Sequence, residues 1–398
     1  MSAESNSLDE ALKSILEMNL DDLAYLGVED SSFREPSTAA PMTLEKRMSG
    51  STKLTRLQEL WEKGQPGDNP SGLPMARNMT QLSVSERTVT YKATVQKVYE
   101  SSIPQVRENY DLICLGEITS LAAVRTLVGN FLDILEKDRN ILLGLCLFES
   151  PNLADYLYRH AVNICLVSMA TAAASGFSRN QVHEIGMGAL LADLGMTMVS
   201  EGILLKSGKL LEEELAEIQR HSASSFALLE KIYDATDTIL AAAYQHHERL
   251  SGAGYPKRRT ANQISQVGRI VGIADTLCAM VHKRSHRDAM TPQAALDKVM
   301  KMGQMNFLDT NLIKNLLRIL SVYPIGTFVD LASGRIGRVV ASHNEDPNRP
   351  IISILKSDAG QALSLKQIIQ VDLLKEKNER IIKITDSAIH KFKALEGF

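Results

Sequence analysis

Apolar residues recur at helical spacing over most of this 398-residue chain, from about residue 85 to residue 322. Two long amphipathic stretches are predicted at about 85–110 and 118–148, and four or more further helices follow them. Aromatic residues make up only 5% of the chain, which favours a helical body over a strand-rich sandwich. The main domain is therefore predicted to be all-α, over residues 85–322, with a helical extension up to about residue 130.

The pattern changes after Pro324, where short runs of β-branched residues replace the helical spacing. The turn signals Ser333-Gly334 and Asp358-Ala359-Gly360 separate several of these runs. We expect residues 324–398 to form a small β-barrel-like module with a helical tail, so that the fold class is mainly α with a small β module. The predicted strands cover 327–331, 336–341, 351–355 and 381–384, and the tail covers 387–395.

The N-terminal part divides into two segments. Apolar residues at helical spacing over residues 8–26, with Gly27 in a capping position, predict an amphipathic helix within 1–27. Residues 28–84 are rich in Pro and Gly and poor in apolar clusters, so they are predicted to be a disordered linker.

Charge and cysteine usage exclude several classes of protein. The net charge of −3 provides no global basic field, so neither DNA nor RNA is an expected partner. The longest apolar run, residues 141–148, is far shorter than the ~20 residues that span a bilayer. We therefore expect a cytoplasmic chain without a transmembrane segment, and reduced core thiols at its four separated cysteines, Cys114, Cys146, Cys165 and Cys278.

Histidine and aspartate residues of the helical domain form an inventory of metal ligands. Imidazoles and carboxylates bind divalent iron, manganese or zinc, and one carboxylate can bridge two ions so that a shared hydroxide becomes a nucleophile. A single histidine on a helix is more often structural, but adjacent histidines followed by a turn are rarer. The candidate ligands are His160, Asp193, His221, His246, His247 and Asp275.

The segment from Gln245, QHHERLSGAGYPKR, resembles the HD-GYP family of bacterial cyclic-dinucleotide phosphodiesterases. The HHE run, the G-x-G-Y-P loop ending at Tyr255 and Pro256, and the Ile-Ala-Asp run ending at Asp275 follow the family's order. The resemblance covers roughly residues 130–322 and implies an HD-domain helical bundle. Its implied substrate is cyclic di-GMP, with Tyr255, Arg284 and Arg287 as the residues that bind it.

Two positions depart from the family's H-D-x-G-K motif, because Ala192 and Met196 stand where its histidine and lysine would be. The resemblance implies that the lost histidine is a ligand of the first metal and that the lost lysine faces a substrate phosphate. Tyr156 occupies the position of the family's optional third-metal glutamate, so no third metal is expected. Cys278 replaces a second aspartate of the family's A-D-x-x-D stretch.

Carried over residue by residue, the resemblance implies two ligand sets that share Asp193, which is also the residue assigned to catalysis. The first ligand set is His160, Asp193 and Asp275, and the second ligand set is Asp193, His221, His246 and His247. Only the second ligand set is complete. We therefore expect about one divalent transition metal per chain, Fe, Mn or Zn.

Three readings of the function follow. The first is a degenerate HD-GYP protein that retains metal binding, and nucleotide binding as well, with weak or no hydrolysis, and acts as a sensor or interaction module. The second is an active metal-dependent phosphodiesterase that produces pGpG or GMP, and the third is a structural adaptor without metal. The sequence leaves these readings and a homodimer open. Expected partners are cyclic di-GMP or its linear product, and a GGDEF-type diguanylate cyclase that contacts an exposed Tyr255 in the GYP loop.

Overall fold

The computed structural model describes residues 84–147, 155–206, 208–283, 289–320 and most of 323–384, with short gaps in the last stretch. The predicted N-terminal helix, the predicted linker up to residue 83, the predicted tail at 387–395, and Arg284 and Arg287 lie outside the described residues. Among the described residues, no helix is both long enough and apolar enough to cross a membrane.

The helical part contains the predicted helices. Two long helices come first, α4 (Val84–Leu115) and α5 (Ala122–Leu147). The helices that follow are α6 (Tyr156–Ala174), α7 (Arg179–Leu191), α8 (Glu201–Leu204), α9 (Glu212–Gln219), α10 (His221–Leu229), α11 (Asp237–Gln245), α12 (Gln266–Val281), α13 (Pro292–Gln304) and α14 (Thr310–Leu320), with short 3-10 helices η4 (Leu194–Met198) and η5 (Ala261–Gln263).

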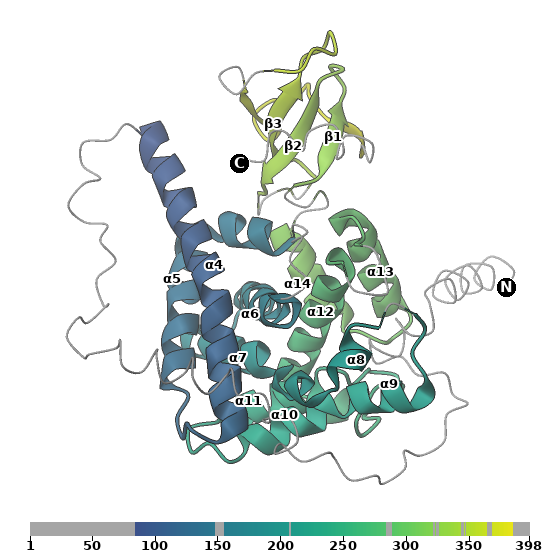
Figure 1. Cartoon of the computed structure of the whole chain (residues 1–398). Helices are drawn as coiled ribbons and strands as arrows, with labels where there is room; N and C mark the ends of the chain where they lie inside the picture. The colour runs from purple at the N-terminus through teal and green to yellow at the C-terminus, as the bar shows by residue number, and fades with distance from the viewer. Residues whose placement is uncertain are drawn as a thin grey trace, which may run out of the picture. The chain divides into compact units, whose positions relative to one another are not determined.

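Helix α6 is the central helix of this bundle. It packs against α5, α7, α12 and α14, and Figure 1 shows it enclosed by other helices. Every residue from His160 to Ala172 is buried, as expected for a helix enclosed by others on all sides. A polar side chain within this stretch therefore lies inside the protein, where it needs a partner.

The strands form one antiparallel sheet in the order β4-β3-β2-β1-β5. Alternate residues, including Val329, Val339 and Ile352, build a small core on one face, and Gly334 has the positive φ that its turn between β1 and β2 requires. Four strands were predicted, and the short β4 was missed. The strands are β1 (Phe328–Leu331), β2 (Ile336–Ala341), β3 (Ile351–Lys356), β4 (Gln370–Asp372) and β5 (Ile381–Ile384).

The prediction of a mainly α fold with a small C-terminal β module is confirmed, with one difference in shape. In the described strands the sheet is open, with β4 and β5 as its two edges, rather than barrel-like. All four cysteines are free thiols, as predicted, and only Cys114 is not fully buried.

Candidate metal centre

The structure brings all six predicted ligands together at one buried place. His160 comes from α6 and Asp275 from α12, while Asp193 lies in the turn between α7 and η4. His221 begins α10, and His246 and His247 follow the last residue of α11. Each of the six residues is at most 2% exposed. They form two groups that share Asp193, which are the two predicted ligand sets.

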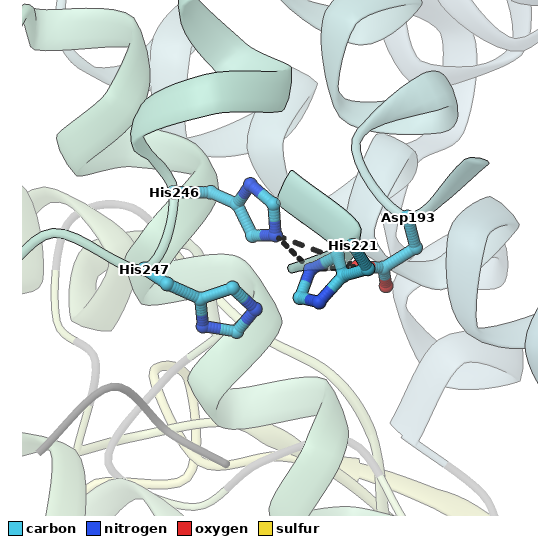
Figure 2. Close-up of side chains that lie close together, drawn as sticks. All are labelled: Asp193, His221, His246 and His247. Atoms are coloured by element: carbon cyan, nitrogen blue, oxygen red, sulfur yellow. Dashed lines mark hydrogen bonds and ion pairs between the residues drawn. The ribbon is translucent and has the colours of Figure 1, made fainter. Parts of the chain in front are cut away.

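In the second ligand set, nitrogen and oxygen atoms converge on one point (Figure 2). Oδ1 of Asp193 lies 3.3 Å from Nε2 of His221 and 3.4 Å from Nε2 of His246. These two Nε2 atoms are themselves 3.2 Å apart. Figure 2 shows the His247 ring beside them. Three imidazoles and a carboxylate in this arrangement suit a first-row transition metal.

Backbone carbonyl groups orient two of these imidazoles. Nδ1 of His221 lies 2.7 Å from the carbonyl oxygen of Ile218, and Nδ1 of His246 lies 3.0 Å from those of Ala242 and Ala243. A carbonyl only accepts, so each Nδ1 carries a proton, and in the neutral form of each ring the lone pair is on Nε2, facing the centre. This is the tautomer that a metal-binding histidine needs.

Close packing places Asp193 beside His221. The backbone N–H of Gly195 donates to Oγ of Ser225 at 2.7 Å, and that hydroxyl donates to the carbonyl of Ala192 at 2.7 Å. A Cβ on Gly195 would lie only 2.2 Å from the carbonyl oxygen of His221. A glycine is therefore required at position 195 for the turn after α7 to contact α10.

The end of α11 explains why two adjacent histidines point the same way. Neighbouring residues inside a helix diverge by about 100°. The helix ends at Gln245, so His246 and His247 lie in the turn that follows and are not bound by helical periodicity. Their ring centroids are 4.1 Å apart.

The electrostatics of the second ligand set prepare it for a cation. Burial alone would raise the pKa of the Asp193 carboxyl, but without a cation the protonated rings of His221 and His246 donate to it, outweigh burial and hold its pKa well below its usual range. Burial lowers the pKa of His246, but the Asp193 carboxylate outweighs burial and raises it, so a cation would take the place of this proton. Burial and the neighbouring imidazoles of His246 and His221 hold the pKa of His247 well below its usual value. Asp193 is therefore ionised and His247 neutral near pH 7, which are the forms that bind metals.

The first ligand set is smaller. Nε2 of His160 lies 3.0 Å from Oδ1 of Asp275 and 3.7 Å from Oδ2 of Asp193. Among the described residues, Oδ2 of Asp193, Oδ2 of Asp275 and Nδ1 of His160 are buried without a hydrogen-bond partner. Orphaned carboxylate oxygens in a buried cluster are what a cation would satisfy, so the chemistry of the donor set fits a metal.

The two positions that depart from the HD motif are both in the core. Ala192 is fully buried, and its methyl side chain offers no ligand atom. Met196 is 4% exposed and packs in an apolar cluster with Val199, Leu210 and Ile218. A lysine at this position would therefore be surrounded by apolar side chains unless the cluster rearranged.

The GYP loop corrects one prediction. Tyr255 was predicted to point outward as an anchor for a partner, but it is only 4% exposed. Its ring stacks on His247 with the centroids 4.6 Å apart. The loop folds this tightly because Gly254 lies against the backbone of residues 247–249, where a Cβ would meet the carbonyl oxygen of His247 at 2.3 Å. Tyr255 is therefore part of the wall of the candidate metal centre.

Sequence reasoning missed Glu248, which connects the loop to the candidate ligands by hydrogen bonds. Its carboxylate accepts hydrogen bonds from the backbone N–H groups of Lys257 and Arg259, both at 2.8 Å, and the residue is only 4% exposed. Arg249 is fully buried, and its Nη1 donates to the carbonyl groups of His246 and Glu248. The signal was present in the sequence, since both charged residues directly follow the histidine pair.

Replacing Glu248 with glutamine is expected to loosen the loop. The amide presents an N–H₂ group where one backbone N–H now donates, so at least one charge-assisted hydrogen bond is lost, which lowers the free energy of unfolding by about 2 kcal/mol. We expect the metal content of purified Glu248→Gln to fall as well, because the loop supports His247. Urea unfolding and elemental analysis measure the two effects.

The control for this variant is Glu379→Gln in the β module. Glu379 is 6% exposed and also accepts backbone N–H groups, those of Ser333 and Arg380. It should lose stability without losing metal. Equal metal content in the two variants would show that the Glu248 contacts do not support the centre.

Comparison with known proteins finds matches for both the helical part and the β module. Residues 151–312 match the family model described as an HD domain, and residues 328–392 match a KOW domain associated with the HD domain. The chain is 25% identical over 283 residues to a cyclic di-GMP phosphodiesterase of Pseudomonas aeruginosa, which covers 71% of this chain and 67% of that protein.

Two further relatives are also named cyclic di-GMP phosphodiesterases. The cyclic di-GMP phosphodiesterase PdeB of Borreliella burgdorferi is 26% identical over 238 residues, which covers 60% of this chain and 62% of PdeB. The cyclic di-GMP phosphodiesterase response regulator RpfG of Xanthomonas campestris is 36% identical over 122 residues, 30% of this chain and 32% of RpfG. The chain thus spans between about one third and two thirds of the length of these relatives.

Proposed function

Because the helical domain of this chain is an HD domain of the HD-GYP family, we propose that it binds one divalent transition metal in the second ligand set. We further propose that it binds cyclic di-GMP or its linear product and hydrolyses it slowly or not at all. In this proposal the protein works as a sensor or interaction module whose ligand is a cyclic dinucleotide.

One observation carries the proposal, the difference between the two ligand sets. In the second ligand set, His221 and His246 have their Nδ1 atoms fixed by backbone carbonyl groups, and both Nε2 atoms face Oδ1 of Asp193. In the first ligand set, Nδ1 of His160 has no hydrogen-bond partner among the described residues, and Ala192 supplies no ligand. The second ligand set is therefore preorganised for a cation and the first is not.

The chemistry of the centre follows from this difference. A bound divalent ion supplies a Lewis acid and lowers the pKa of water bound to it. Asp193 contributes its Oδ1 to the second ligand set, whereas its buried Oδ2 faces His160. With Ala192 in place of an imidazole, the first ligand set would hold a second ion weakly, so water activation that depends on two ions would be impaired.

The substrate class rests on the named relatives and on the loop. Several relatives are cyclic di-GMP phosphodiesterases. A dianionic dinucleotide needs phosphate donors next to the metal, a role we assign to Arg284 and Arg287, because guanidinium groups bind phosphate oxygens bidentately. Tyr255 would contribute as the inner wall of the centre, next to His247.

The experiment that tests this function combines elemental analysis of the purified protein with equilibrium binding of labelled cyclic di-GMP. We expect about one transition metal per chain and nucleotide binding that weakens when the metal is removed with a chelator. Two tightly held ions would support the active phosphodiesterase instead, and no ion would support the adaptor without metal.

The contact with a GGDEF-type cyclase remains a proposal that the resemblance suggests. Since Tyr255 is buried, such a contact would have to use the exposed residues of the loop, Lys257 and Arg258. Replacing both with glutamate should weaken capture of a cyclase and leave the metal content unchanged. Capture that stays equally strong would remove this loop from the contact.

A further inference from the structure

A hydrogen-bond network of three buried polar side chains crosses the helical bundle next to the first ligand set. Tyr99 on α4 donates its hydroxyl hydrogen to Oδ1 of Asn163 on α6 at 2.7 Å. Nδ2 of Asn163 lies 3.2 Å from Nε2 of His282, the C-cap residue that directly follows α12. The three residues are 2%, 0% and 5% exposed.

The direction of each hydrogen bond in this network can be assigned. Nδ1 of His282 lies 2.7 Å from the carbonyl oxygen of Cys278, so it carries the proton and donates. Nε2 of His282 is then the acceptor for the Asn163 amide, and the Asn163 oxygen accepts from Tyr99. The amide oxygen and nitrogen of Asn163 thus each have a matching partner.

This network connects the two helices that carry His160 and Asp275. Asn163 follows His160 by one turn on α6, and His282 follows Asp275 by two turns on α12. The helices are therefore joined by two polar contacts, His160–Asp275 at 3.0 Å and Asn163–His282 at 3.2 Å. Only the first of these contacts contains metal ligands.

Helix α4 holds α6 on both sides of His160. Tyr99 bonds Asn163, which follows His160, while the adjacent Glu100 accepts two hydrogen bonds, at 3.0 and 3.1 Å, from Arg159, which precedes it. Tyr99 and Glu100 lie N-terminal to residues 151–312, the part that matches the HD domain. A segment outside that domain thus fixes the position of one of its ligands.

We propose that Tyr99, Asn163 and His282 are positioning residues for the first ligand set, which hold α6 and α12 in the register that His160 and Asp275 need to bind a second, weaker metal ion. This rests on the proposed function, because it takes the Asp/His cluster as a metal centre. A satisfied buried network is rigid. Loss of a direct hydrogen-bond partner of a metal ligand typically lowers metal affinity 10–100-fold, and because these three residues act one contact further out, we expect the lower end of that range. In a set that has lost one imidazole, such support decides whether the second ion binds.

The test is a titration of metal-free full-length protein with Co²⁺, in which binding is monitored by calorimetry and by visible absorption. The unaltered protein should show a tight binding event at the second ligand set and a weak binding event at the first. Tyr99→Phe removes one hydroxyl without changing the ring, and we expect it to weaken the weak event about tenfold and to change the tight event less than twofold. His282→Leu should act in the same way.

Two further variants separate positioning from general destabilisation. His282→Gln keeps an acceptor near the place of Nε2 and should restore the weak event to within about threefold of the unaltered protein. Tyr110→Phe is the matched control: Tyr110 is also a fully buried tyrosine on α4, and its hydroxyl donates to the carbonyl of Leu190 at 2.6 Å. It should not selectively weaken the weak event.

The remaining outcomes overturn the inference in distinguishable ways. An unchanged weak event in Tyr99→Phe, or an equal loss in Tyr110→Phe, rejects the positioning role. A single event in the unaltered protein, even at millimolar Co²⁺, also rejects it and leaves the proposed function intact. Absence of both events rejects the proposed function itself.

Discussion

Replacing His246 with alanine should reduce the metal content of the purified protein from about one ion per chain to less than about 0.1. His246 supplies one of the two Nε2 atoms that face Oδ1 of Asp193, at 3.4 Å, and its Nδ1 is fixed by two backbone carbonyl groups. Loss of this ligand leaves a three-residue set with a shared carboxylate, which binds a first-row metal far more weakly. Elemental analysis of protein purified without added metal measures the change.

Two control variants define which ligand set holds the ion. His183→Ala removes a half-buried histidine of α7 whose Nε2 bonds the carbonyl of Arg125, outside both ligand sets, and should retain the metal. His160→Ala disrupts only the first ligand set and should retain it as well. If His160→Ala loses the ion as completely as His246→Ala, the tightly held metal is not confined to the second ligand set.

Hydrolysis of cyclic di-GMP by the unaltered protein is expected to be slower than that of an intact two-metal centre by a factor of ~10⁴ or more. Removal of one group that stabilises charge in the transition state costs ~10²–10³ in rate, and here two such groups, the histidine and the lysine of the HD motif, are replaced. Chromatographic separation of pGpG and GMP in the presence of Mn²⁺ or Fe²⁺ measures turnover. Rapid turnover with either metal would establish the active phosphodiesterase instead.

Restoring the motif should raise this activity, and the two changes should differ in their effect on stability. Ala192→His adds an imidazole to the first ligand set, and we expect about 100-fold faster turnover together with a second bound ion. Met196→Lys places an ammonium group in the apolar cluster of Val199, Leu210 and Ile218, so it should destabilise the fold by several kcal/mol unless a phosphate is bound. Ala192→Leu, similar in bulk but without a ligand atom, is the control.

Much of the fold could be predicted because its signals are local. Helical spacing of apolar residues predicted α4, α5 and the helices after them, and β-branched runs predicted four of the five strands. The three-residue strand β4 was missed because Gln370–Asp372 is too short to show an alternating pattern. The open edge of the sheet could not be predicted either, because strand order depends on pairing between distant segments.

The sequence by itself, through its resemblance to the HD-GYP family, singled out the six candidate ligands. It also determined that Ala192 and Met196 supply neither the imidazole nor the ammonium group of the family's HD motif, because residue type alone sets that chemistry. The tertiary structure decided which way side chains face. Tyr255 points inward because Gly254 lies against the backbone of His247, a contact between chain segments that no local pattern encodes.

The same reason explains the hydrogen-bond partners of Glu248 and His282, which only the tertiary structure showed. Glu248 bonds backbone N–H groups nine and eleven residues further along the chain, and His282 meets Asn163 across 119 residues of sequence. The identity of a polar residue states what it can donate or accept, but its partner is decided by packing between helices. A buried polar side chain must find such a partner, and only the folded chain determines which one it finds.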